Sequence, residues 1–200
     1  KEQVEDQKEA VRIAEAAKLD GSRALQQLQI AESFVGNNRK AFGYAEQRLA
    51  GTISSGKYGA IAHAYGQLAQ YQAWLGDLEA ARVSIDTAER TLANPQYMRW
   101  PGYNISHSDQ RGSIQRSQIE IEMAAGRYEE AEKLARAALG NVLLSMRNEA
   151  QIRQYIPDLA PGTYNIVELV STNRLGNALL RQGRAVEAEA ASAESEPDPD

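Results

Sequence analysis

The residue types of a hydrolytic triad occur side by side at one point in the chain, Ser106-His107-Ser108-Asp109. A working triad needs a nucleophile, a base and a buried orienting acid that converge in space, together with an oxyanion hole. Adjacent residues of one segment cannot supply that geometry. The only other histidine, His63, falls within a predicted helix, and a metal site needs several convergent donors. We therefore expect no catalytic residue, no metal site and no cofactor, and do not expect an enzyme.

Other signatures of chemistry are missing from the sequence. It contains no phosphate-binding G-x-x-x-x-G-K-[ST] loop and no G-x-G-x-x-G fingerprint. The net charge of -5 disfavours nucleic acid, and no stretch is apolar over the ~18 residues that a membrane span needs. The absence of cysteine excludes disulfides and thiolate metal sites. We expect a protein or peptide partner, no nucleic acid and no membrane insertion.

The elements that carry these residues are predicted to be helices. The chain is rich in Ala, Glu, Gln, Leu and Arg, which all form helices readily. No stretch shows the sustained alternation of apolar and polar residues that strands need. The composition therefore predicts an all-α fold.

A glycine followed five residues later by an alanine recurs four times, with a helical pattern on both sides. The copies are Gly36…Ala41, Gly76…Ala81, Gly126…Ala131 and Gly183…Ala188. Glycine ends a helix in a left-handed conformation at no steric cost, and Asp77 is placed to cap the helix that follows the second turn. The alanine falls in the first turn of that following helix, where a larger side chain would force two antiparallel helices apart. Each copy therefore predicts a tight helix–turn–helix pair.

At these residues the chain resembles the tetratricopeptide repeat (TPR) family. That family has a glycine at the turn, an aromatic residue or leucine two positions later, and a leucine eight positions before the glycine. Leu78 and Tyr128 fit the second place, and Leu28, Leu68 and Leu175 fit the third. The last copy, RLGNALLRQGRAVEAEAA, is similar to repeats of kinesin light chains and of bacterial proteins joined to caspase-like domains. The resemblance covers residues 22–195 and implies a right-handed superhelical solenoid of antiparallel helix pairs.

The resemblance also implies where a ligand would lie, because the first helices of successive pairs line the concave side of such a stack. Ten side chains are expected to face that groove: Gln67, Gln70, Trp74, Arg116, Glu120, Met123, Asn173, Arg174, Asn177 and Arg181. An asparagine amide offers a donor and an acceptor to an extended peptide backbone, and Arg174 or Arg181 can grip a carboxylate bidentately. Trp74 stands beside a turn, where an aromatic residue is more often part of the core between repeats.

The spacing of the turns departs from the standard repeat. The turn glycines are 40, 50 and 57 residues apart (76−36, 126−76 and 183−126), whereas a standard repeat has ~34 residues. Longer helices can absorb the first excess, and the others predict inserts near residues 94–110 and 148–165. Residues 1–21 are expected to form a capping or preceding helix, and residues 196–200 an acidic tail or linker.

The sequence thus predicts a non-catalytic TPR-type scaffold that binds a protein or peptide and is part of a larger bacterial protein. The bacterial source is suggested by 16 arginines against 6 lysines. Two alternatives stay open: the regulatory or sensor region of a larger enzyme, such as a caspase-like protease, and a self-associating structural module. The compartment is open between the cytoplasm and, if a signal peptide was removed, the periplasm.

Overall fold

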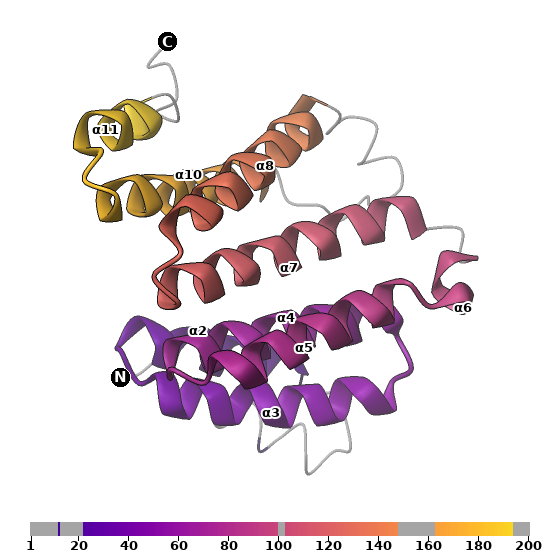
Figure 1. Cartoon of the computed structure of the whole chain (residues 1–200). Helices are drawn as coiled ribbons and strands as arrows, with labels where there is room; N and C mark the ends of the chain where they lie inside the picture. The colour runs from indigo at the N-terminus through magenta and orange to yellow at the C-terminus, as the bar shows by residue number, and fades with distance from the viewer. Residues whose placement is uncertain (1–11, 13–21, 100–102, 148–162, 194–200) are drawn as a thin grey trace. The chain divides into compact units, whose positions relative to one another are not determined.

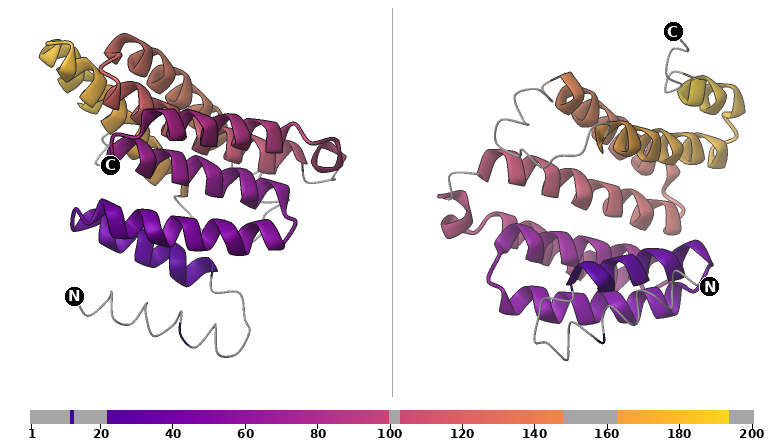
Figure 2. Two further views of the ribbon diagram at one scale, coloured as in Figure 1. Left: turned by 60° about the horizontal axis from the view of Figure 1, so that its bottom comes forward. Right: turned by 180° about the vertical axis from the view of Figure 1, so that it is seen from behind.

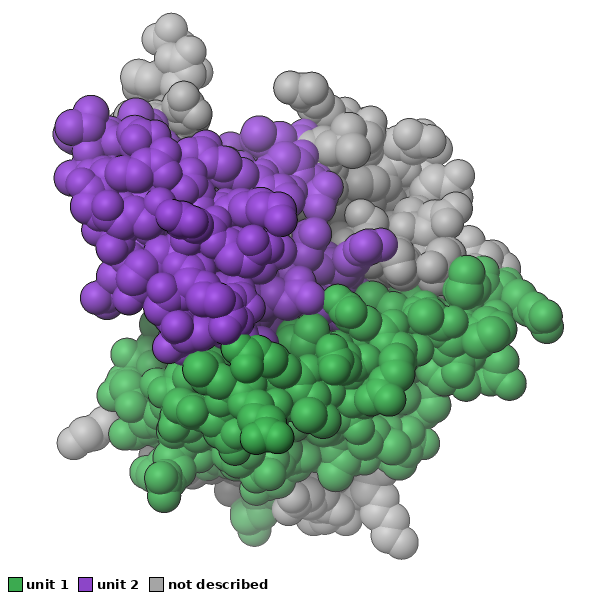
Figure 3. Space-filling view, in the orientation of Figure 1, with its two compact units in different colours: residues 1–100 green, residues 101–200 purple. Residues whose placement is uncertain are grey.

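The computed structural model describes residues 12, 22–99, 103–147 and 163–193 (Figure 1). Within those ranges the chain contains helices and turns and no strand, which confirms the predicted all-α class. Contacts within the chain divide it into two units, Lys1–Trp100 and Pro101–Asp200 (Figure 3).

The described part of the first unit consists of consecutive antiparallel helices and one short helix. They are α2 (Ser22–Phe34), α3 (Asn38–Ser54), α4 (Tyr58–Trp74), α5 (Leu78–Leu92) and α6 (Pro95–Met98). Helix α3 packs against both α2 and α4, and α4 packs against α5 (Figure 2). Each long helix therefore lies beside the helix that follows it in the sequence.

The second unit repeats this arrangement in its described part. Its helices are α7 (Tyr103–Ala124), α8 (Tyr128–Arg147), α10 (Thr163–Arg181) and α11 (Ala185–Ala193). Helix α8 packs against α7 and α10, and α10 packs against α11. The pairs α7–α8 and α10–α11 each surround one of the predicted glycine turns.

The four predicted turns share one backbone geometry. Gly36, Gly76, Gly126 and Gly183 have φ between +73° and +87°, the left-handed region. The residue after each glycine donates its N–H to the carbonyl five positions earlier, at 2.8–3.0 Å. This pair of features is the Schellman motif, which satisfies carbonyls at the end of a helix. All four predicted turns are confirmed, and so is the cap at Asp77, whose Oδ1 accepts the N–H of Ala80 at 3.0 Å.

A further turn at Gly56, with φ of +67°, is one that the glycine–alanine pattern does not predict. The fifth residue after Gly56 is Ile61, so the alanine of the pattern is missing there. Gly56 divides the 40 residues between Gly36 and Gly76 into two helices of 17 residues, α3 and α4. Helix length therefore takes up the first excess, as the sequence analysis expected.

The segment expected as an insert at residues 94–110 is largely helical where it is described. The Asn94 side chain accepts the N–H of Gln96 at 2.8 Å and so caps α6. Pro95 stands in the first turn of α6, where the N–H that proline lacks would have no partner within the helix. Tyr97 is 5% exposed, and its ring lies 6.4 Å from that of Tyr58, so α6 packs back onto α4.

Residues 103–110 belong to α7, so they lengthen a helix. The other expected insert, at 148–165, lies outside the described residues except for the first residues of α10. The expected N-terminal helix at 1–21 lies outside them apart from Arg12, and the tail at 196–200 lies outside them entirely.

The alanine of each repeat is buried between packed helices. Ala41, Ala81 and Ala131 are fully buried, and Ala188 is 4% exposed. In the second unit a buried cluster joins both pairs: Ile119, Ala131, Ala135, Ala138, Leu175, Ala178, Leu179 and Ala188. With so many alanines in this cluster, the helix axes can approach closely, and a larger side chain has no space to enter.

We expect Ala131→Leu to lower the free energy of unfolding by ~1–3 kcal/mol, because the added atoms must push α8 away from its neighbours. Urea unfolding followed by circular dichroism measures this change. Ala137→Leu is the matched control, because Ala137 is exposed on the same helix. Equal effects of the two substitutions would contradict the close approach at Ala131.

Candidate functional site

Helix α10 has two exposed leucines and two buried residues with hydroxyl groups. Leu169 and Leu180 are 53% and 55% exposed, whereas Ser171 and Thr172 are 0% and 2% exposed. The Ser171 hydroxyl donates to the carbonyl of Val167 at 2.8 Å, which satisfies it inside the unit. Leu169 and Leu180 add exposed aliphatic surface to α10.

Three of the predicted groove residues, Asn173, Asn177 and Arg181, are exposed on this same helix. Their helical spacing places them on one face together with Val170 and Leu180. We call these five residues the α10 face. It combines two amides, one guanidinium and two exposed aliphatic side chains.

Arg174 does not share this exposure. Its Nε donates to Glu120 Oε1 at 2.7 Å, and the two side chains are only 15% and 19% exposed. The ion pair links α7 to α10, so two predicted groove residues contact each other. Arg174 is therefore already paired with a carboxylate of the chain, and Arg181 is the cation that the α10 face presents to solvent.

The remaining predicted residues of α7 are more enclosed. Arg116 is half-buried, and Met123 is partly buried and packs against the core of the second unit. Met123 therefore has only part of its side chain available for a ligand. The structure brings together Glu120 and Arg174 by contact, and Asn173, Asn177 and Arg181 by a shared face.

In the first unit Gln67 lies in an interior polar network. Its Oε1 accepts hydrogen bonds from Gln29 Nε2 at 3.2 Å and from Arg48 Nη1. Gln29 and Arg48 are 1% and 8% exposed, and a buried guanidinium requires acceptors. Gln67 thus serves the packing of α2, α3 and α4. Its side chain is also partly exposed, so its place in a groove stays a prediction.

The other two predicted residues of α4 lie toward the edge of the first unit. Gln70 is half-buried, whereas Trp74 is 37% exposed. The Trp74 ring meets that of Tyr71 edge-on, with centroids 5.2 Å apart. Burial raises the pKa of the Tyr71 hydroxyl. Trp74 therefore packs on Tyr71 with one side and shows the other to solvent.

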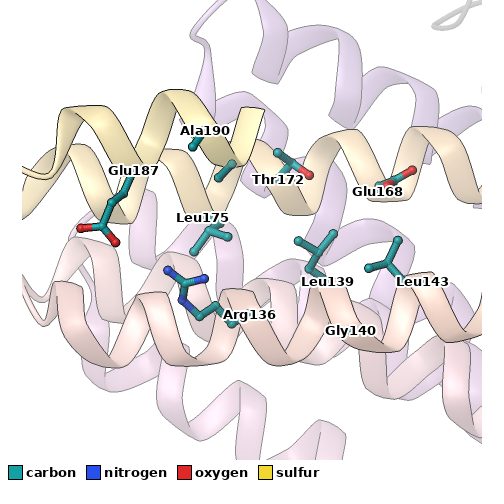
Figure 4. A pocket seen from close by; sticks show the side chains of 10 residues that line it. Arg136, Leu139, Gly140, Leu143, Glu168, Thr172, Leu175, Glu187 and Ala190 are labelled. Carbon is teal, nitrogen blue, oxygen red and sulfur yellow. The ribbon is translucent and has the colours of Figure 1, made fainter. Parts of the chain in front are cut away.

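A pocket of about 470 Å³ lies between α8, α10 and α11 of the second unit (Figure 4). Its lining residues are Arg136, Leu139, Gly140, Leu143, Glu168, Thr172, Leu175, Glu187, Ala190 and Ala191. None of them is among the site residues predicted from the sequence. The one sequence signal is Gly140, because a glycine inside a helix costs ~0.5–1 kcal/mol relative to alanine. A Cβ at Gly140 would meet nothing within 4 Å, so the packing of the unit does not require a glycine there.

A cluster of charges, which we call the Glu132 cluster, stands at one end of this pocket. Glu132 accepts hydrogen bonds from Arg136 at 2.9 Å, from Arg184 at 2.5 Å and from Gln182 at 3.0 Å. Arg184 also pairs with Glu187 through two hydrogen bonds of 2.7 and 2.5 Å. The Gln182 amide, with Arg136 and Arg184, holds the pKa of Glu132 below its usual range. Arg184 likewise lowers the pKa of Glu187.

The residues considered from the sequence for catalysis or metal binding lie on two helices, α4 and α7. His63 is half-buried on α4, and the segment Ser106–Asp109 lies in α7 with side chains outside what is described. In the described ranges no group of three or more His, Cys, Asp or Glu side chains is arranged to hold a metal ion. None of the described helices is both long enough and apolar enough to cross a membrane.

The chain matches no family model and no curated protein. Two similar solved structures are of a predicted kinesin light chain of Podosopora anserina with nearly identical TPR-like repeats. The first is 18% identical, has a TM-score of 0.53, and the match covers 96% of this chain and 82% of that one. The second is 17% identical, with a TM-score of 0.49 and coverage of 96% and 83%. The first likeness shows that the chain has a TPR-like helical repeat fold, as the resemblance in the sequence implied.

We expect Glu132→Gln to lower stability at pH 7 and to make it less sensitive to acid. The pKa of Glu132 is lower in the folded chain than its ordinary value of 4.5, so its charge stabilises the fold above that pH. The contribution is lost as the pH falls through the folded pKa. Urea midpoints should therefore differ between wild type and variant at pH 7, and differ by less at an acid pH below 4.5. A difference of the same size at both pH values would contradict this role.

Proposed function

We propose that the chain is a non-catalytic, protein-binding scaffold, part of a larger bacterial protein, whose α10 face holds an extended peptide segment of the partner. The observation that carries this proposal is the exposure of Asn173 and Asn177 between exposed aliphatic side chains on a helix that buries its hydroxyls. Exposed amides flanked by aliphatic side chains can offer a peptide both hydrogen bonds and apolar contacts. The TPR-like fold supports the proposal, because stacked helix pairs present extended surfaces for binding.

The spacing of the two asparagines suits an extended ligand. Residues four apart on a helix are separated by about 6 Å along its axis. Two residues of an extended strand span about 6.6 Å. Asn173 and Asn177 can therefore each donate to and accept from alternate residues of one peptide backbone.

The charge of the face indicates the chemistry of the peptide. Glu120 neutralises Arg174, whereas Arg181 lies one turn beyond Asn177 and is exposed. Arg181 is placed to pair with an acidic side chain two residues further along the peptide. Val170 and Leu180 offer apolar contacts beside the amides. The best ligand is thus an extended segment with an acidic residue and apolar neighbours.

A photo-crosslinking residue in place of Asn177 tests this proposal. It should link the chain to a protein in lysate of the source cells, whereas the same residue in place of Glu129, exposed on α8, should not. We expect Asn173→Ala/Asn177→Ala to weaken binding of the captured segment by at least ~10-fold, because up to four peptide hydrogen bonds are lost. The fold should be unaffected, since both side chains are exposed.

Glu129→Ala/Glu130→Ala is the matched control for the binding measurement, and it should leave the affinity unchanged. Cross-linking from position 129 and not from 177, or full affinity in the asparagine variant, would place binding elsewhere. Urea midpoints of both double variants show whether a loss of binding is a loss of folding.

A further inference from the structure

The pocket between α8, α10 and α11 is open to solvent. Leu143 is 38% exposed at its wall, and Gly140 faces open space. Alanine at position 140 would fit and would favour the helix. The glycine keeps a space that the packing of the unit does not itself need. An apolar side chain of another molecule would bury Leu143 and fill that space.

Charge distinguishes the two ends of this pocket. Arg136 and Glu187 belong to the Glu132 cluster, in which two arginines balance two glutamates. Glu168 stands at the other end, across from Leu143 (Figure 4). The pocket therefore carries a net negative charge near Glu168. A molecule that binds there should supply an apolar side chain with a positively charged group close by.

The same chain presents such a group at the turn between α2 and α3. Phe34 is 87% exposed and Val35 is 64% exposed. Arg39 and Lys40, in the first turn of α3, are exposed as well. We call these four residues the α2–α3 knob. They bring two large apolar side chains and two positive charges within seven residues.

The turn at Gly76 also has exposed apolar side chains, but its charge is the opposite one. Trp74 and Leu75 are 37% and 40% exposed, but Asp77 and Glu79 follow them. These carboxylates would be repelled by Glu168. Charge and exposure together therefore favour the α2–α3 knob over the turn at Gly76.

We propose that the chain associates with a second copy of itself, the α2–α3 knob of one copy entering the α8–α10–α11 pocket of the next. Phe34 lies against Leu139 and Leu143, and Arg39 and Lys40 face Glu168. The two surfaces differ, so the contact is heterologous: the copy that inserts its knob keeps a free pocket, and the copy that receives it keeps a free knob. Such contacts extend into chains of copies. The α10 face takes no part, so this association and the proposed peptide binding fail or succeed independently.

Sedimentation velocity of the whole chain over a range of concentrations tests the association. The weight-average mass should rise above 22.0 kDa with concentration and fall again in 0.5 M NaCl, because salt screens the charge contacts. Phe34→Ser should weaken association at least ~10-fold, as expected for an aromatic anchor. Gly140→Leu should do the same by filling the pocket, and leucine is the better helix former. Leu75→Ser, at the acidic turn, is the control and should change nothing.

Charge reversal identifies the partners within the contact. Glu168→Lys alone should abolish association, and the triple variant Glu168→Lys/Arg39→Glu/Lys40→Glu should restore it. Circular dichroism confirms that each variant is folded. A mass of 22.0 kDa at every concentration would overturn the proposal. Association that survives Phe34→Ser and Gly140→Leu, or that the triple variant does not restore, would overturn it equally.

Discussion

The backbone reversal at a positive-φ glycine is the constraint on which each helix pair depends. At each of the four predicted turns the glycine N–H bonds to the carbonyl three positions earlier, and the next N–H bonds to the carbonyl five positions earlier. Because these bonds join backbone groups, they set the geometry whatever side chains stand nearby. The alanine five residues later then allows the two helices to touch. Which faces are left exposed follows from this packing.

Between one pair and the next, polar contacts supplement the apolar core. In the first unit Gln29 of α2 and Arg48 of α3 both bond to Gln67 of α4. In the second unit the ion pair of Glu120 and Arg174 connects α7 with α10. Such contacts depend on direction, whereas small apolar side chains can slide along one another. They therefore fix the register in which neighbouring pairs meet.

The fold could be predicted from the sequence because its signals are local. A glycine, an alanine at the fifth position and helix-forming residues around them define each pair. The turn at Gly56 was not predicted because Ile61 stands where the pattern has an alanine, although the turn itself needs only the glycine. The binding residues were harder to predict, since helical spacing finds residues that share a face but not what covers that face.

Gln67 and Asn177 illustrate this difference. Both are amides on the first helix of a pair, yet Gln67 bonds to Arg48 from the neighbouring helix and Asn177 is exposed. No pattern along the chain shows that Arg48 would come close. The pocket at Gly140 is likewise formed by three helices and left only one weak sign in the sequence, a glycine within a helix.

The length of α3 and α4 affects how much surface the first unit offers for contact. A period of 40 residues in place of the usual ~34 adds about three residues, or roughly 4.5 Å, to each of these two helices. Each helix then has space for nearly one more side chain on every face. A molecule lying across such helices crosses a wider strip of surface than on a standard repeat. The first unit thus gains contact area because α3 and α4 are longer, without the addition of another helix pair.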